Sequence, residues 1–307
     1  MSDIKLSIII PVYNEAENLI RFIPELDRAL SKLSSEYELL AINDGSTDES
    51  LSMLIKLKKK FVRLKILSLR KNFGKSAAYL VGFTKAKGDI ILTIDSDGQD
   101  MPGEIPKLLE VLKKGYQVVV GWRKKRSDPA PKKFSSFLWN KVLSISSGIK
   151  LHDVNCGLKA FRHEVLNSHY FRGDFHRYLP VIIAMDGYKA TEVEVSHRKR
   201  LKGTSKYNYS RFFPALFDYA TCMFLARFGF KPMHLFGSIG FFIFMLGMLI
   251  NFYLLLIKLT GESIGGRPLL ILGLLFTLAG LQLVFTGFLG DLIIRREDLS
   301  PEDYLLT

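Results

Sequence analysis

The sequence predicts an α/β domain with a mostly parallel central sheet, followed by an interfacial helix and two transmembrane helices. Two observations lead to this fold class. Within residues 1–205, short apolar runs alternate with segments of helical periodicity, which is typical of parallel strands joined by crossover helices. After Met233 come two apolar runs without Asp, Glu, Lys or Arg, and each exceeds the roughly 20 residues that a membrane-spanning helix needs.

The strands and helices of the α/β domain are predicted from their residue patterns, in chain order. Residues 6–12 form a β-branched run typical of a buried strand, and residues 16–33 carry apolar side chains at helical spacing. Further short apolar runs predict strands at residues 37–42, 64–69, 90–94 and 118–120. The segments between and after them predict helices at residues 50–60, 76–85 and 105–113.

Polar, acidic and glycine-bearing loops follow the first four strands, at residues 11–15, 43–48, 70–75 and 95–100. The carboxyl ends of parallel strands meet at one edge of a sheet, where ligands bind in folds of this class. A single loop such as Asp44-Gly45-Ser46 is more often a helix cap or a turn. Four such loops at one edge therefore predict a binding site.

The loop after the fourth strand has the ligands of a divalent metal. Asp95 and Asp97 stand at alternate positions, and Gln99 follows two residues later. Hard oxygen ligands of this kind suit Mg²⁺ or Mn²⁺, which completes its shell with waters and phosphate oxygens. A lone Asp-x-Asp would be a solvated turn, but the preceding strand and the other three loops favour a site. The sequence has no Walker loop and no Gly-x-Gly-x-x-Gly motif, so neither ATP hydrolysis nor dinucleotide redox chemistry is expected.

Composition supports a folded protein with a membrane part. Charged residues make up 24% and aromatic residues 12% of the 307 residues, which excludes a disordered or collagen-like chain. The mean hydropathy is +0.15, and the apolar excess follows Met233. The two cysteines, Cys156 and Cys222, cannot form a disulfide framework, and no Cys/His cluster has zinc spacing.

These motifs carry a family resemblance. The runs PVYNE, DGSTD, RKNFGK and DSDGQD, with the proline and Glu104 that follow, resemble the family-2 glycosyltransferases of the GT-A fold. More narrowly, the chain resembles the polyprenyl-phosphate glycosyltransferases, the group of dolichol-phosphate mannose synthase and bacterial undecaprenyl-phosphate sugar transferases. The likeness continues through HDVNCG at residues 152–157, DFHR at 174–177 and the segment 200–207, and it ends in the paired spans.

The resemblance implies that seven residues bind the nucleotide sugar: Pro11, Tyr13, Glu15, Asp44, Lys75, Asp95 and Arg123. The first four match positions that hold the base and ribose, and the others match contacts near the sugar and phosphates. At Asn43 the chain departs from many relatives, which have a second aspartate there. Because asparagine keeps a hydrogen-bonding side chain, we discount this difference.

The resemblance also implies metal and catalytic residues. Asp97 and Gln99 match the metal ligands for Mg²⁺ or Mn²⁺, and the catalytic set comprises Asp97, Asp153, Arg200 and Lys206. Arg200, Ser205 and Lys206 match a basic loop that meets the phosphates of donor and acceptor lipid. A lipid monophosphate is already largely deprotonated at pH 7. Asp153 is therefore assigned to positioning the sugar or acceptor, with base catalysis as the alternative.

The two apolar runs, residues 233–257 and 269–289, predict an integral membrane protein. Basic residues flank the pair at Arg211, Arg227, Lys231, Arg295 and Arg296, which places the catalytic domain and both termini in the cytoplasm. The first residues lack the apolar core of a cleaved signal peptide. The expected domains are a catalytic domain (1–205), an interfacial helix (206–232), a transmembrane hairpin (233–298) and a tail (299–307). For the interfacial helix, a packed helix of the catalytic domain is the alternative.

The expected activity is a metal-dependent, inverting transfer of a sugar from a UDP- or GDP-linked donor to undecaprenyl or dolichyl phosphate. The expected partners are therefore the nucleotide diphosphate sugar, the polyprenyl phosphate and the bilayer, with no nucleic acid and with a homo-oligomer left open. One alternative is transfer to a different lipid or glycan acceptor. Against a polymer synthase, the chain has no Gln-x-x-Arg-Trp motif and only two spans. A catalytically inactive binding protein is a further alternative, which the intact Asp95, Asp97, Gln99 and Lys206 disfavour.

Overall fold

The computed structural model describes residues 5–33, 36–124, 149, 151–166, 175–198, 217, 220–221, 223–224, 228 and 231–294. The chain divides into two compact units, Met1–Met223 and Phe224–Thr307, and each is considered by itself. Three of the predicted site residues, Arg200, Ser205 and Lys206, lie outside the described residues, as do the predicted tail and most of the predicted interfacial helix.

The first unit is built on a mixed, mostly parallel sheet. Its described strands are β1 (Leu6–Val12), β2 (Tyr37–Asn43), β3 (Leu64–Ser68), β4 (Ile90–Thr93), β5 (Val118–Trp122), β6 (Lys159–Arg162) and β7 (Ala190–Glu194). They are arranged in the order β3-β2-β1-β4-β6-β5-β7. Among the described strands, only β6 is antiparallel to its neighbours, β4 and β5, whereas the other pairs are parallel. The predicted α/β fold class is confirmed.

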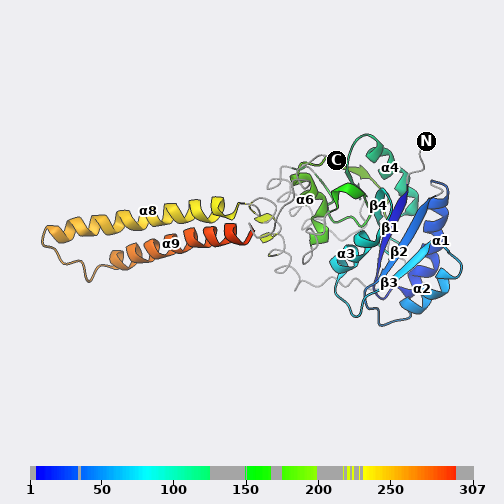
Figure 1. Ribbon diagram of the computed structural model, residues 1–307, viewed down its shortest axis with the longest axis horizontal. Helices are drawn as coiled ribbons and strands as arrows, with labels where there is room; N and C mark the ends of the chain where they lie inside the picture. The colour runs from blue at the N-terminus through cyan, green and yellow to red at the C-terminus, as the bar shows by residue number, and fades with distance from the viewer. Residues whose placement is uncertain are drawn as a thin grey trace. The chain divides into compact units, whose positions relative to one another are not determined.

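Helices cover both faces of this sheet (Figure 1). They are α1 (Ala16–Ser31), α2 (Ser50–Lys58), α3 (Lys75–Lys85), α4 (Ile105–Lys113) and α6 (Leu179–Met185), with short 3-10 turns η1 (Pro102–Glu104), η2 (His163–Val165) and η4 (Phe175–Arg177). In Figure 1, α1 and α2 lie on one side of β1–β3 and α3 lies on the other. This follows from right-handed crossovers, because the chain moves outward from β1 to β3 and then returns to β4.

The strand directions bring the binding loops together. Because β6 is antiparallel to both β4 and β5, the latter two run in the same direction. The carboxyl ends of β1, β2, β3, β4, β5 and β7 therefore share one edge of the sheet, and β6 begins there. Strands β1, β2 and β4 are buried almost throughout, which fixes this edge rigidly.

Two strands were not predicted. Strand β6 is only four residues long and begins with Lys159, so it lacks a readable apolar run. Strand β7, with the sequence ATEVE, is partly exposed at the edge of the sheet. The nine elements that were predicted in this unit all occur, with ends shifted by up to two residues.

The second unit contains two long apolar helices, α8 (Pro232–Leu259) and α9 (Pro268–Ile294), which lie side by side as an antiparallel hairpin (Figure 1). Both have a mean hydropathy of 2.3 over an 18-residue window and are long enough to cross a membrane. Glycines bring the helices together: a Cβ on Gly240 would lie 2.7 Å from the carbonyl oxygen of Gly280. Across the same interface, Asn251 donates a 3.1 Å hydrogen bond to Thr277. The outward faces remain apolar, as expected of spans surrounded by lipid.

Candidate active site

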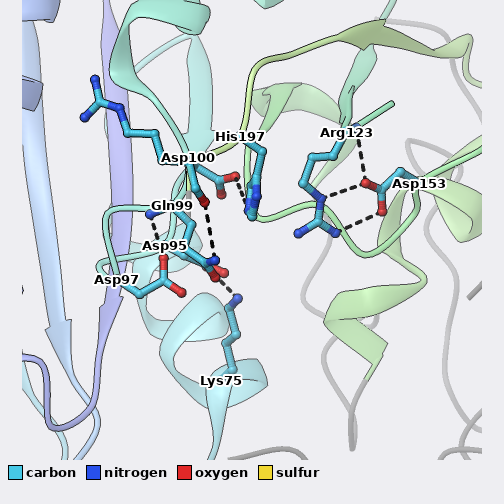
Figure 2. A network of polar contacts seen from close by, with 9 residues as sticks. Lys75, Asp95, Asp97, Gln99, Asp100, Arg123, Asp153 and His197 are labelled. Atoms are coloured by element: carbon cyan, nitrogen blue, oxygen red, sulfur yellow. Dashed lines mark hydrogen bonds and ion pairs between the residues drawn. The ribbon is translucent and has the colours of Figure 1, made fainter. Parts of the chain in front are cut away.

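The loop after β4 presents its polar side chains to one side. Asp95, Asp97 and Gln99 are partly exposed and alternate with buried Ser96 and Asp100. The Ser96 hydroxyl donates a 2.8 Å hydrogen bond to the carbonyl of Pro11, which ties the loop to the end of β1. The Asp97 carboxylate accepts the backbone N–H of Gln99 at 3.1 Å (Figure 2). We call residues 95–100 the aspartate loop.

Lys75, the first residue of α3, reaches the aspartate loop. Its ammonium lies 2.5 Å from a carboxylate oxygen of Asp95 (Figure 2). Burial disfavours the charge of Lys75, but the Asp95 carboxylate outweighs this effect and raises the lysine pKa. Likewise, burial raises the pKa of Asp95, but the charge of Lys75 reverses the effect and holds this pKa below its usual value. Both groups are therefore charged at neutral pH.

The loop before α3 is held by Asp44. Its two carboxylate oxygens accept the backbone N–H groups of Phe73 at 2.8 Å and Gly74 at 3.0 Å. Gly74 has φ of +92°, a conformation that favours glycine. In this structure, the buried Asp44 thus shapes the loop that presents Lys75, a role that the sequence did not indicate.

The loop after β1 is tied to the loop after β2. Asn14 has φ of +54°, and its backbone N–H donates to the Ser46 hydroxyl at 3.1 Å. The backbone N–H of Glu15 donates to the Ser50 hydroxyl at 2.8 Å. Tyr13 is partly exposed on the same loop. These contacts hold the loop after β1, with the predicted base-binding and ribose-binding residues Tyr13 and Glu15, against the loop after β2.

Arg123 and Asp153 form a buried bidentate ion pair. The guanidinium Nε lies 2.7 Å from Oδ2 of Asp153, and Nη2 lies 3.0 Å from Oδ1. The backbone N–H of Arg123 donates to Oδ2 at 3.3 Å. The Asp153 side chain is 1% exposed. Both oxygens of this carboxylate are therefore engaged, as suits a positioning group rather than a proton acceptor.

Asp100 and Gly157 were not among the predicted site residues. A Cβ on Gly157 would lie 2.5 Å from Oδ2 of Asp100 and 2.6 Å from Cγ of Asp95, so only glycine fits between the two carboxylates. Burial, together with the negative charge of Asp95, raises the pKa of Asp100 to about 7. Within the described residues, Oδ1 of Asp100 has no hydrogen-bond partner, and Nε2 of His197 lies 4.0 Å away (Figure 2).

Lys159, at the start of β6, is a second buried cation beside the site. Burial, with the charge of Lys75, lowers the pKa of Lys159 to about 8. Its ammonium donates to the carbonyl of His176 at 3.3 Å. The His176 ring lies 2.7 Å from the Ser76 hydroxyl, and burial lowers its pKa well below the usual value. No clear sequence signal indicated Lys159, because strand β6 lacks a readable apolar run.

The structure thus brings six of the predicted site residues into one cluster: Lys75, Asp95, Asp97, Gln99, Arg123 and Asp153 (Figure 2). Within the described part of the chain, no three His, Cys, Asp or Glu side chains are placed to hold a metal by themselves. The Asp97 carboxylate and the Gln99 amide, both partly exposed on the aspartate loop, still fit Mg²⁺ or Mn²⁺. Such ions commonly take their remaining ligands from water and substrate phosphates.

Comparisons with known proteins agree with this geometry. Residues 7–170 match the model of glycosyl transferase family 2. The chain is 34% identical to the dodecaprenyl-phosphate galacturonate synthase of Rhizobium johnstonii, with 98% of this chain and 92% of that protein covered. It is 33% identical to the undecaprenyl-phosphate 4-deoxy-4-formamido-L-arabinose transferase of Pseudomonas fluorescens, with 94% and 84% covered.

Among solved structures, the chain is similar to glucosyl-3-phosphoglycerate synthase from Mycobacterium tuberculosis in complex with Mn²⁺ and UDP-glucose. The TM-score is 0.55 at 20% identity, with 74% of this chain and 79% of that chain covered. The complex of that synthase with phosphoglyceric acid gives a TM-score of 0.55 at 19% identity, with 73% and 80% covered. At this identity the likeness shows the fold, a sheet of the GT-A type.

Proposed function

The chain belongs to glycosyl transferase family 2, and from this premise we propose that it transfers a sugar from a nucleotide diphosphate sugar to the phosphate of a membrane polyprenol. The observation that carries the proposal is the likeness to two polyprenyl-phosphate sugar transferases along almost the whole chain. This likeness extends beyond the catalytic unit into the region of α8 and α9. A membrane lipid as acceptor explains why the two apolar helices accompany the sugar-transfer fold.

We propose that the site works with Mg²⁺ or Mn²⁺. Asp97 and Gln99 would hold the ion, with oxygens of the donor diphosphate in its remaining positions. The similar solved structure with Mn²⁺ and UDP-glucose supports this assignment. When bound, the ion supplies positive charge that stabilises the departing nucleotide diphosphate.

The basic side chains of the protein would bind the phosphates of donor and acceptor and reduce the repulsion between them. The acceptor monophosphate is already a nucleophile at pH 7, so the main barrier is its repulsion by the donor diphosphate. Lys75 lies at the cluster with its charge maintained by Asp95. We assign Lys75 and Arg123 to the donor phosphates, and Arg200, Ser205 and Lys206 to the acceptor phosphate. In-line attack at the anomeric carbon would invert its configuration.

Asp153 would position Arg123. Its carboxylate holds the guanidinium through two hydrogen bonds and is itself buried. The ion pair fixes the plane of the guanidinium, which leaves Nη1 outside the pair. We assign Asp153 to this orienting role and not to proton abstraction, because the acceptor needs no base.

We propose that the catalytic unit and both termini face the cytoplasm. The support is the excess of basic residues in the segments that flank the pair of apolar helices, before the first and after the second.

A labelled-donor assay tests the proposed function. Purified protein receives radiolabelled UDP- or GDP-linked sugars, undecaprenyl or dolichyl phosphate and Mn²⁺, and the lipids are then extracted. We expect label in the lipid fraction with at least one donor, and its loss with EDTA. In the Asp97→Ala variant the rate should fall by about a hundredfold or more, the scale of losing a principal electrostatic stabiliser. Label that appears only in a different lipid or a glycan would favour the alternative acceptor class.

A further inference from the structure

The segment that follows β7 is hydrogen-bonded to the aspartate loop. His197 and Asp100 form an isolated antiparallel β-bridge, and the backbone N–H of Arg198 donates to the carbonyl of Gln99 at 2.9 Å. In addition, Nε2 of Gln99 lies 3.5 Å from the carbonyl oxygen of Arg198, at the long limit of a hydrogen bond. Residues 197–198 therefore contact both the backbone and the side chain of Gln99.

An ion pair attaches the same segment to helix α1. The guanidinium of Arg198 lies 3.0 and 3.1 Å from the two carboxylate oxygens of Glu25. Both side chains are 39% exposed. Helix α1 is anchored in the core by the buried side chains of Phe22, Ile23 and Leu26, so Glu25 stands on a rigid element. The bidentate geometry restrains Arg198 more strongly than a single contact would.

The orientation of the Gln99 amide depends on this attachment. An amide has a donor end and an acceptor end, and its partner determines which way each one points. With Nε2 directed at the Arg198 carbonyl, Oε1 is directed away from residues 197–198. Only Oε1 can bind a metal, so a displaced Arg198 would release the amide to rotate. Groups outside the ligand shell commonly tune metal affinity in this way.

We propose that Glu25 and Arg198 are positioning residues for the metal site, because their ion pair fixes the backbone that orients the Gln99 amide. The inference rests on the proposed function, since Gln99 is a ligand only if the site binds a divalent ion. It adds to that function two residues that lie outside the loops expected to touch substrate.

Manganese binding without turnover tests this inference. Mn²⁺ is titrated into the full-length protein in detergent, with UDP or GDP present, and free Mn²⁺ is followed by electron paramagnetic resonance. Arg198→Ala and Glu25→Ala should each weaken Mn²⁺ binding by about two- to fivefold, the range of an exposed ion pair. The double variant should be no weaker than either single variant, because both remove the same contact.

A matched control is Lys114→Ala, which removes the exposed ion pair between Lys114 and Glu110 on α4. This variant should bind Mn²⁺ like the parent protein. Unchanged Mn²⁺ affinity in both single variants, or independent losses that multiply in the double variant, would overturn the inference. If the parent protein itself binds no Mn²⁺ with either nucleotide, the proposed metal site fails together with the inference, and this outcome is distinct from equal binding by parent and variants.

Discussion

Acidic and basic side chains lie close together at this site, and the acidic ones differ in whether a cation contacts them directly. Asp153 is almost fully buried and has Arg123 as a bidentate partner. Asp95 has Lys75. Asp100 is equally buried but has no cation in direct contact among the described residues, and its pKa rises accordingly.

Arg123→Ala should destabilise the folded protein strongly. Removing one member of a buried ion pair leaves the other charge uncompensated, at a cost of about 3–5 kcal/mol. The Asp153 side chain, at 1% exposure, cannot recover that energy from water. Thermal unfolding in detergent measures the effect. Lys124→Ala is the control, because its pair with Glu194 is exposed at both ends and should contribute about 1 kcal/mol or less. Equal unfolding midpoints for the two variants would contradict the assignment.

Asp100→Asn should become more stabilising, relative to the parent protein, as the pH rises from about 4 to about 7. The unfolded chain releases the Asp100 proton near pH 4, whereas the folded protein keeps it up to a pKa of about 7. In the parent protein, the carboxyl of Asp100 therefore makes its full contribution to the unfolding free energy below about pH 4. This contribution is lost as the pH rises towards 7. Asparagine has no proton to lose, so the difference in unfolding free energy grows by at most about 1.4 kcal/mol per pH unit.

The measurement is chemical denaturation of both proteins across this pH range, with EDTA present so that metal binding does not contribute. Comparing the two proteins cancels the effect of His176, whose lowered pKa acts in the opposite direction near pH 6. A difference in unfolding free energy that does not vary with pH would show that Asp100 titrates normally.

At the scale of elements, the loop that leads into β6 closes against the aspartate loop without a side chain between them. Gly157→Ala would place a methyl group 2.5 Å from the Asp100 carboxylate and 2.7 Å from the Asp95 carboxylate. The resulting shift of the aspartate loop should lower the transfer rate by about ten- to a hundredfold, as small misplacements of catalytic groups do. Circular dichroism should still report a folded protein.

Gly103→Ala is the matched control for that substitution, because a Cβ at Gly103 would have no atom within 4 Å. This glycine lies in η1, directly after the aspartate loop. Its variant should keep the parent rate. Similar losses in both variants would mean that any added methyl group near this loop disturbs the site, and the specific closure at Gly157 would be wrong.

The elements also show what the sequence could predict. Strands β1, β2 and β4 are buried on both faces, so their apolar runs revealed both their positions and the loops that follow them. Strand β6 could not be found, because its pairing between β4 and β5 depends on residues distant in sequence. The close contact of Gly157 with the aspartate loop could not be predicted for the same reason. Local patterns indicate strands and loops, whereas contacts between distant loops appear only in three dimensions.

Asp44 illustrates the same limit within the predicted site. The family resemblance implied a nucleotide contact for Asp44, and the structure shows in addition that its two oxygens accept backbone N–H groups of the loop before α3. The Asp-x-Asp-x-Gln spacing, in contrast, was informative once the preceding strand and the other three loops were considered with it, because alternate residues of this loop are similarly exposed. The assignments of individual residues to nucleotide, metal and acceptor remain predictions for mutagenesis.

In the whole molecule, one chain contains a GT-A catalytic unit and a hairpin of two candidate membrane spans. The hairpin is closely packed through glycines and has apolar outward faces, which suits a lipid environment. A water-soluble acceptor would need no such hairpin. The two units therefore support the same central claim, that the sugar is transferred to a lipid phosphate.

The chemical structure of the lipid product tests this claim most directly. Lipid made by the purified protein from a nucleotide sugar and undecaprenyl phosphate is examined by ³¹P nuclear magnetic resonance and mass spectrometry. We expect a single phosphodiester between sugar and polyprenol, with the anomeric configuration opposite to that of the donor and with free nucleoside diphosphate as the other product. A polyprenyl diphosphate sugar released together with nucleoside monophosphate, or a sugar on any acceptor other than the lipid phosphate, would contradict it.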